Sequence, residues 1–117
     1  MKKIVDMDRP WGGFEQFTLN ENTTVKILTV KPNQRFSLQY HNKRKEFWKF
    51  LDNPAEVTLG DKVIPVKEND EIIIPVKVKH RIKALDKPVR VLEISFGFFD
   101  ENDQVRLEDD YDRDSPK

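Results

Sequence analysis

Two histidines, one glutamine and one glutamate are the residues of this chain whose types and spacing could bind a metal ion. Gln39 and His41 stand two residues apart in FSLQYH, where apolar and polar side chains alternate, so they share one face of a strand. Glu46 follows after a basic turn, and His80 comes after a bend led by Pro75 that could bring it alongside. Two imidazoles, a carboxylate and an amide oxygen that converge would form a ligand set for a divalent cation.

The alternative is that each histidine is an ordinary exposed or hydrogen-bonded residue of a β-protein. A Gln-x-His pair alone is weak evidence for a metal, and the spacing of the full set leaves both interpretations open.

The elements that must position these residues are strands. β-Branched and aromatic residues alternate with polar ones, Gly60-Asp61 predicts a tight hairpin turn, and no segment shows a sustained apolar period of 3.6 residues. Many short strands at this spacing predict a sandwich or barrel. The predicted strands cover residues 23–30, 34–41, 46–51, 55–60, 62–67, 70–76, 79–85 and 89–99.

Length and composition favour one domain over residues 1–117, with an acidic tail from about residue 112 that we expect to be partly mobile. The absence of cysteine excludes disulfides and thiolate metal sites. No apolar signal segment opens the chain, and no run approaches the roughly 20 apolar residues of a membrane helix. These features predict a cytoplasmic protein that does not bind membranes.

The zero net charge is unevenly spread. Residues 1–99 hold 18 Lys and Arg against 13 Asp and Glu, whereas residues 100–117 hold 3 against 8. A mildly basic body suits a small anionic ligand such as a sugar phosphate. Nucleic acid is not a predicted partner, because the sequence has no basic stripe with interleaved aromatic residues.

Four segments, in one order from about Arg9 to Arg113, resemble the cupin domain of the type II mannose-6-phosphate isomerases: RPWGGFEQF, LTVKPNQRFSLQYHNKRKEFW, IIIPVKVKHRI and VRLEDDYDR. The resemblance implies an all-β fold, the cupin jelly-roll β-barrel or double-stranded β-helix. In many relatives this cupin follows a mannose-1-phosphate nucleotidyltransferase domain. The Gly-rich nucleotide loop of that domain is absent here, so the resemblance implies the isomerase half alone.

The resemblance also implies the metal site. In the family, the Gln, His and Glu of the first motif and the His of the second bind the metal, and in this chain these are Gln39, His41, Glu46 and His80. One divalent ion is therefore expected, with zinc in first place and manganese, cobalt, nickel or iron as alternatives.

Cupins commonly dimerise through an apolar sheet face. Phe36, Leu38 and Tyr40 lie on the face of the predicted strand opposite Gln39 and His41, and such a face must be covered. A homodimer is therefore expected.

Two turns depart from the family pattern. Pro32-Asn33 stands where Pro-Gly is usual, and Asn tolerates the positive φ that Gly would supply. Val76-Lys77 stands where Ala-Gly is usual and places a long cation near the second histidine. Neither change removes an expected ligand, but both leave open a drift in substrate preference.

Aldose–ketose isomerisation moves a proton between C2 and C1, so it needs a base close to those carbons. Glu93, on the last long strand, is the first choice for this base, and Lys26 is the reserve. The alternation on that strand leaves open whether Glu93 faces the barrel interior. Surface charge on a sheet edge is the alternative interpretation for both residues.

The phosphate needs fixed donors, and the planar fork of arginine supplies them best. Arg35, which shares a predicted strand face with Gln39, and Arg106 are the predicted anchors, and Trp48 is predicted to line the substrate site or the core. A solvated turn is the favoured interpretation of Lys43, Arg44 and Lys45.

The predicted function is therefore the metal-dependent interconversion of mannose 6-phosphate and fructose 6-phosphate. One alternative is a non-catalytic cupin that binds a sugar phosphate. Another is an isomerase or epimerase acting on a different phosphosugar or on a nucleotide sugar.

Overall fold

Alternating β-branched and aromatic segments form all the regular structure in residues 3–111, the part of the chain that the computed structural model describes. Within these residues there are eleven strands and no helix that could cross a membrane. The strands are β1 (Ile4–Arg9), β2 (Gly12–Gln16), β3 (Thr23–Val30), β4 (Leu38–Tyr40), β5 (Glu46–Phe50), β6 (Ala55–Leu59), β7 (Lys62–Val66), β8 (Glu71–Ile74), β9 (His80–Ala84), β10 (Val89–Phe96) and β11 (Val105–Glu108).

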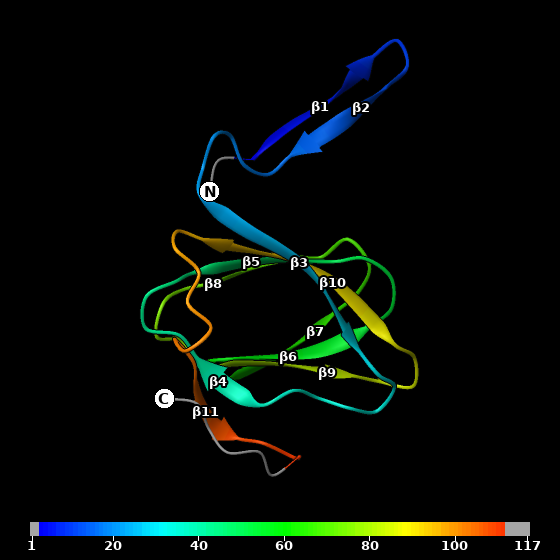
Figure 1. Ribbon diagram of the computed structural model, residues 1–117. Coiled ribbons are helices and arrows are strands. Elements are labelled where there is room, and N and C mark those ends of the chain that lie inside the picture. Colours follow the sequence, from blue (N-terminus) through cyan, green and yellow to red (C-terminus); the bar gives the residue numbers. More distant parts are fainter. Residues whose placement is uncertain (1–2, 112–117) are drawn as a thin grey trace.

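Two antiparallel sheets make the body of the molecule. One has the order β3-β10-β5-β8 and the other the order β11-β4-β9-β6-β7, so strands distant in sequence become neighbours, as the jelly-roll prediction requires. Figure 1 shows the two sheets facing each other, with the β1–β2 hairpin projecting away from them.

The core lies between the sheets and is built from inward-facing residues of both. Trp48 and Phe50 on β5 meet Val57 on β6 and Ile82 on β9, and all four side chains are fully buried. Period-two alternation along each strand explains this, because every second residue points to the same face.

The segment predicted as one strand over residues 34–41 is wrong in part. Arg35 makes only an isolated bridge to Lys83, and β4 begins at Leu38. Phe36 instead packs edge-on against the core residue Trp48, with ring centroids 6.1 Å apart. Phe36 therefore does not share an outer apolar face with Leu38, and the basis of the predicted dimer surface is removed.

The other predicted strands are present with slightly shorter ends, whereas β1, β2 and β11 were not predicted as strands. The acidic tail expected from about residue 112 lies outside the described residues.

Among the turns with a left-handed backbone, three bear on the sequence predictions. Gly60 has a φ of 61° in the predicted hairpin turn. Asn33 has a φ of 62°, at the position where the family usually has glycine and where asparagine was expected to tolerate a positive φ. Lys77 has a φ of 64°, and its N–H donates to the carbonyl of His41 at 2.6 Å. The turn at Lys77 therefore ties the chain that leads to His80 directly to His41.

Lys77→Gly should stabilise the protein. A side chain in the left-handed region costs about 1–2 kcal/mol, which outweighs the roughly 0.5–1 kcal/mol that a glycine costs through the unfolded chain. Lys62→Gly is the matched control, since it removes another exposed lysine from an ordinary strand position of β7 and should destabilise. Urea unfolding measures both, and a loss of stability in Lys77→Gly would contradict the expectation.

Candidate metal centre

His41, Glu46 and His80 come together in a buried cluster. Each side chain is 1–2% exposed, and one potential ligand atom from each lies within 4.8 Å of the others. The Nε2 atom of His41 lies 3.5 Å from one carboxylate oxygen of Glu46, and the Nε2 atom of His80 lies 3.8 Å from the other. The sequence prediction of a convergence is therefore met for these three residues.

Strand ends from both sheets create this arrangement. Glu46 is the first residue of β5, His80 is the first residue of β9, and His41 directly follows β4. The two imidazole rings lie 5.0 Å apart between centroids, and the ring of Trp48 packs edge-on against His80. The cluster therefore sits at one end of the barrel, on top of the apolar core.

In both imidazoles, a main-chain carbonyl group determines which ring nitrogen carries the proton. The Nδ1 of His41 lies 2.6 Å from the carbonyl of Asp103, and the Nδ1 of His80 lies 2.9 Å from the carbonyl of Val78. A carbonyl can only accept, so each Nδ1 carries the proton and each Nε2 presents its lone pair. This is the arrangement in which a histidine serves as a metal ligand.

Two atoms of the cluster are buried and have no hydrogen-bond partner: the Oε1 of Glu46 and the Nε2 of His80. An unsatisfied buried acceptor costs about 1–3 kcal/mol, so native structures rarely leave one without a reason. Burial lowers the pKa of His41 and lowers that of His80 to about 4, so both rings are neutral at pH 7. The donor set therefore fits a divalent cation.

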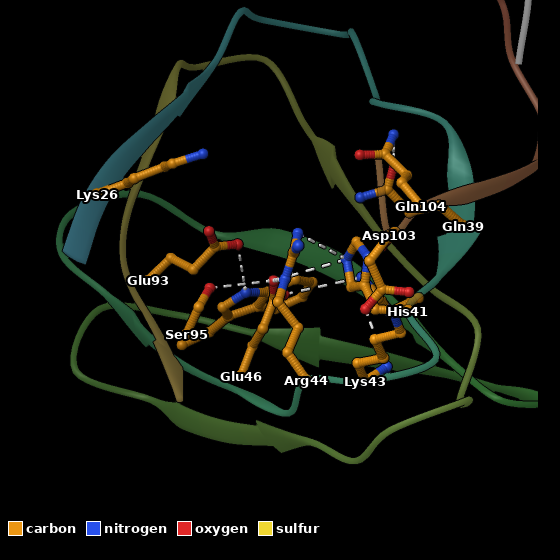
Figure 2. Close-up of polar contacts among 12 residues, drawn as sticks. Lys26, Gln39, His41, Lys43, Arg44, Glu46, Glu93, Ser95, Asp103 and Gln104 are labelled. Atoms are coloured by element: carbon orange, nitrogen blue, oxygen red, sulfur yellow. Dashed lines mark hydrogen bonds and ion pairs between the residues drawn. The ribbon is translucent and has the colours of Figure 1, made fainter. Parts of the chain in front are cut away.

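The side-chain oxygen of Gln39 is bound by two other side chains. Gln39 pairs in register with His80, but its Oε1 accepts hydrogen bonds from Ser37 Oγ and Gln104 Nε2, each at 2.7 Å. Figure 2 shows the side chains of Gln39 and Gln104 next to each other. Its role as the fourth ligand stays a prediction.

Arg44 is buried, and its assignment to a solvated turn is wrong. Its side chain is 7% exposed, its Nε donates to Glu46 Oε2 at 3.0 Å, and its Nη2 lies 3.4 Å from the Nε2 of His41. No strand alternation marks this role, because Arg44 lies in the turn before β5, which begins at Glu46.

Asp103 was also missed. Its carboxylate accepts the main-chain N–H groups of Asn42 and Lys43, each at 2.9 Å, while its carbonyl fixes His41. No local pattern marks this role, because Asp103 reaches His41 from 62 residues away in the sequence.

Glu93 faces the barrel interior. The sequence had left open which face of its strand points inward. Glu93 is 7% exposed, and its Oε2 accepts a hydrogen bond from Trp48 Nε1 at 3.2 Å. Burial, together with the negative charge of Glu46, raises the pKa of Glu93 to about 7. A carboxyl group with this pKa can exchange a proton near neutral pH.

Lys26 and Trp48 have different surroundings. Lys26 lies directly opposite Glu93 on β3 and is partly exposed, with its ammonium over the ring of Phe99. Trp48 is fully buried, so the structure makes it a core residue that holds Glu93 rather than a wall in contact with substrate.

Arg106 and Arg35 are separated by the fold. Arg106 pairs in register with Gln39, which pairs with His80, so the three side chains form a row on one sheet face. Arg35 instead bridges to Lys83, three residues and roughly 10 Å further along β9 than His80. The placement of Arg35 beside the metal site is therefore wrong.

Arg35 has a partner of its own. It forms a two-pronged ion pair with Asp110, at 2.7 and 2.8 Å, beside a pocket that it lines with Leu28, Gln34 and Tyr111. The pair fastens the closing segment of the chain to the far end of the barrel.

Comparison with known sequences gives a family match over residues 1–109, to the family described as mannose-6-phosphate isomerase C-terminal. The xanthan biosynthesis protein XanB of Xanthomonas campestris is 41% identical over 90% of the chain, and the alginate biosynthesis protein AlgA of Pseudomonas aeruginosa is 38% identical over 90%. A mannose-1-phosphate guanylyltransferase of Salmonella muenchen is 35% identical over 92%. The chain spans about a quarter of the length of these relatives, 22–23%.

Solved structures share the fold. Oxalate decarboxylase from Bacillus subtilis superposes with a TM-score of 0.68 at 28% identity, over 74% of this chain and 24% of that one. The capsular polysaccharide assembling protein CapF from Staphylococcus aureus gives 0.65 at 19% identity, over 92% and 33%. A cupin-2 domain from Rhodospirillum rubrum gives 0.64 at 20% identity, over 74% and 59%. The predicted cupin jelly-roll fold is confirmed.

The metal cluster leads to a prediction about metal occupancy. His41→Ala and His80→Ala should each strongly reduce the divalent metal found by elemental analysis, because each removes one of few buried donors. Asn42→Ala, at an exposed neighbouring position, is the control and should leave the metal content unchanged. Gln39→Ala tests the fourth ligand separately. Full occupancy in both histidine variants would contradict a site made of these residues.

The raised pKa of Glu93 leads to a prediction about how stability depends on pH. A group whose pKa rises from 4.5 when unfolded to about 7 when folded binds its proton more tightly in the folded state. Its contribution to stability is therefore present below pH 4.5 and lost as the pH rises through 7, by about 3 kcal/mol.

Glu93→Gln mimics the protonated form and should not show this loss. In chelator-treated protein, the variant should match the wild type at pH 4 and exceed it in unfolding free energy at pH 8. Val91→Ala, at a neighbouring buried position of β10 without a titrating group, should lower the stability at every pH and run parallel to the wild type. A constant difference between wild type and Glu93→Gln across this range would refute the shift.

Proposed function

This chain belongs to the mannose-6-phosphate isomerase C-terminal family, and from that membership and the buried cluster we propose that it interconverts mannose 6-phosphate and fructose 6-phosphate with the help of a divalent metal. The observation that carries the proposal is the pair of unpartnered buried atoms, Glu46 Oε1 and His80 Nε2, at the centre of the family's metal-binding motifs. In a purely structural β-barrel, these two unpaired atoms would only lower the stability.

His41, Glu46 and His80 would hold the metal, with zinc as the first choice and manganese, cobalt, nickel or iron as alternatives. A cation at this position would supply Lewis-acid stabilisation to the sugar oxygens at C1 and C2. The carbonyls of Asp103 and Val78 hold both imidazoles in the ligating orientation, so the chain needs little rearrangement at the histidines.

Glu93 is the proposed carrier of the proton between C2 and C1. It lies on the interior face, next to Glu46, with a pKa that allows it to accept and return a proton near neutral pH. The hydrogen bond from Trp48 fixes its carboxyl group at one place. Lys26, directly across β3, is the reserve for this role.

Arg106 is the proposed phosphate anchor. It is separated from His80 by two strand spacings, roughly 10 Å, on the same sheet face. This separation suits a six-carbon sugar phosphate that presents one end to the metal ligands and its phosphate to the arginine. Arg35, at the far end of the barrel, no longer fits this role.

The test is turnover of mannose 6-phosphate by the whole chain, loaded in turn with zinc, cobalt, manganese and nickel. Formation of fructose 6-phosphate that stops with chelator and in Glu93→Gln would support the proposal. Metal-loaded protein that binds the sugar phosphate without converting it would overturn the isomerase and favour a binding module.

In that assay, Arg106→Ala should lower kcat/KM about ten- to a hundredfold, since a charged hydrogen bond contributes roughly 1.5–3 kcal/mol. Arg106→Lys should restore only part, because an ammonium group lacks the planar fork. Arg35→Ala removes the same charge at the far end of the barrel and is the matched control, with little effect expected. If Arg35→Ala lowered kcat/KM more than Arg106→Ala, Arg35 and not Arg106 would be the phosphate anchor.

The homodimer stays a prediction. Val25 and Ile27 on β3 and Ile73 on β8 are apolar and exposed on the outer side of their sheet. Analytical ultracentrifugation of the whole chain would decide whether a second copy covers them.

A further inference from the structure

Arg44 forms hydrogen bonds with two of the atoms that would bind a metal. Its Nε donates to Glu46 Oε2 at 3.0 Å, and its Nη2 donates to the Nε2 of His41 at 3.4 Å. The side chain is 7% exposed, and Figure 2 shows it lying between Glu46 and His41. The contact is therefore an internal ion pair of the cluster and not a surface salt bridge.

We propose that Arg44 is a built-in competitor of the metal, a tethered cation that holds Glu46 and His41 until a divalent ion displaces it. This inference rests on the metal site of the proposed function, but it does not depend on which reaction the site performs.

The two cations exclude each other for a chemical reason. The Nε2 of a neutral imidazole has one lone pair, which either accepts an N–H of Arg44 or binds a metal. A metal at the usual distance of about 2.0–2.2 Å from His41 and Glu46 would also lie against the guanidinium, and two like charges repel strongly in a buried site. Metal binding therefore requires Arg44 to leave its present position.

The surroundings offer the displaced side chain a place to remain. The Nη1 of Arg44 donates to the carbonyl of Asp100 at 3.1 Å, and its guanidinium lies 4.3 Å from the ring centroid of Phe99. Neither partner is a metal ligand, so both contacts can persist when the contacts to Glu46 and His41 break. A short swing toward Asp100 and Phe99 would free both ligands and keep the charge at the mouth of the site.

The competition has two consequences. It weakens metal binding, because the ion must first break an existing pair. It also stabilises the protein without metal, because the buried Glu46 carboxylate always has a cationic partner.

The experiment compares Arg44→Met with Lys45→Met. Both remove one positive charge from adjacent positions, but Lys45 is exposed and its ammonium lies over Phe96, outside the cluster. Titration calorimetry with Zn²⁺ should show binding to Arg44→Met about tenfold to a hundredfold tighter than to wild type, and unchanged binding to Lys45→Met. Thermal unfolding with chelator should show Arg44→Met less stable than both, with the difference reduced by Zn²⁺.

Arg44→Lys provides a second variant if Arg44→Met does not fold without metal. A lysine keeps the charge but cannot reach both ligands with one planar fork, so Zn²⁺ should bind it more tightly than the wild type. Weaker or unchanged Zn²⁺ binding in these variants would overturn the competition and make Arg44 a support of the metal site. If calorimetry confirms the competition but the protein has no isomerase activity, the proposed function is refuted and the role of Arg44 as a competitor stands.

Discussion

The buried carboxylate of Glu46 is the constraint on which the site depends. A charge that is 1% exposed cannot remain without partners, because its desolvation costs several kcal/mol. Arg44 and the hydroxyl of Ser95 contact one oxygen, and both histidines turn a ring nitrogen toward the carboxylate. The ends of β5, β9 and β10 are thus arranged around one negative charge, and a divalent ion would complete what Arg44 only partly satisfies.

Two carboxyl groups in one barrel have different properties because their neighbours differ. Glu46 is paired with a guanidinium, whereas Glu93 accepts the indole N–H of Trp48 and is repelled by Glu46. The first is therefore suited to holding a cation and the second to exchanging a proton near neutral pH. Different surroundings can thus give two carboxyl groups of one site different roles.

Local patterns in the sequence predicted most of the strands and the convergence of His41, Glu46 and His80, because period-two alternation and turn residues act over a few neighbours. The interpretation of these residues as metal ligands came from the family resemblance. Local patterns could not place Arg35, since the chain leaves the strand between residues 35 and 38 and the alternation loses its register there. Asp103 and the pairing of Gln39 with Gln104 were beyond prediction for a different reason. Both are contacts across more than 60 residues that only the closed barrel creates.

The segment after β10 links the fixed and the movable parts of the site. Through the Asp103 carbonyl it holds His41 in the ligating orientation, and through the Asp100 carbonyl it holds Arg44, which competes for the same ring. Because these are separate carbonyls, Arg44 can move while His41 stays fixed. The ring of Phe99 contacts the cations of both Lys26 and Arg44. Metal entry would then change the charge at the mouth of the barrel while leaving the two imidazoles where they are.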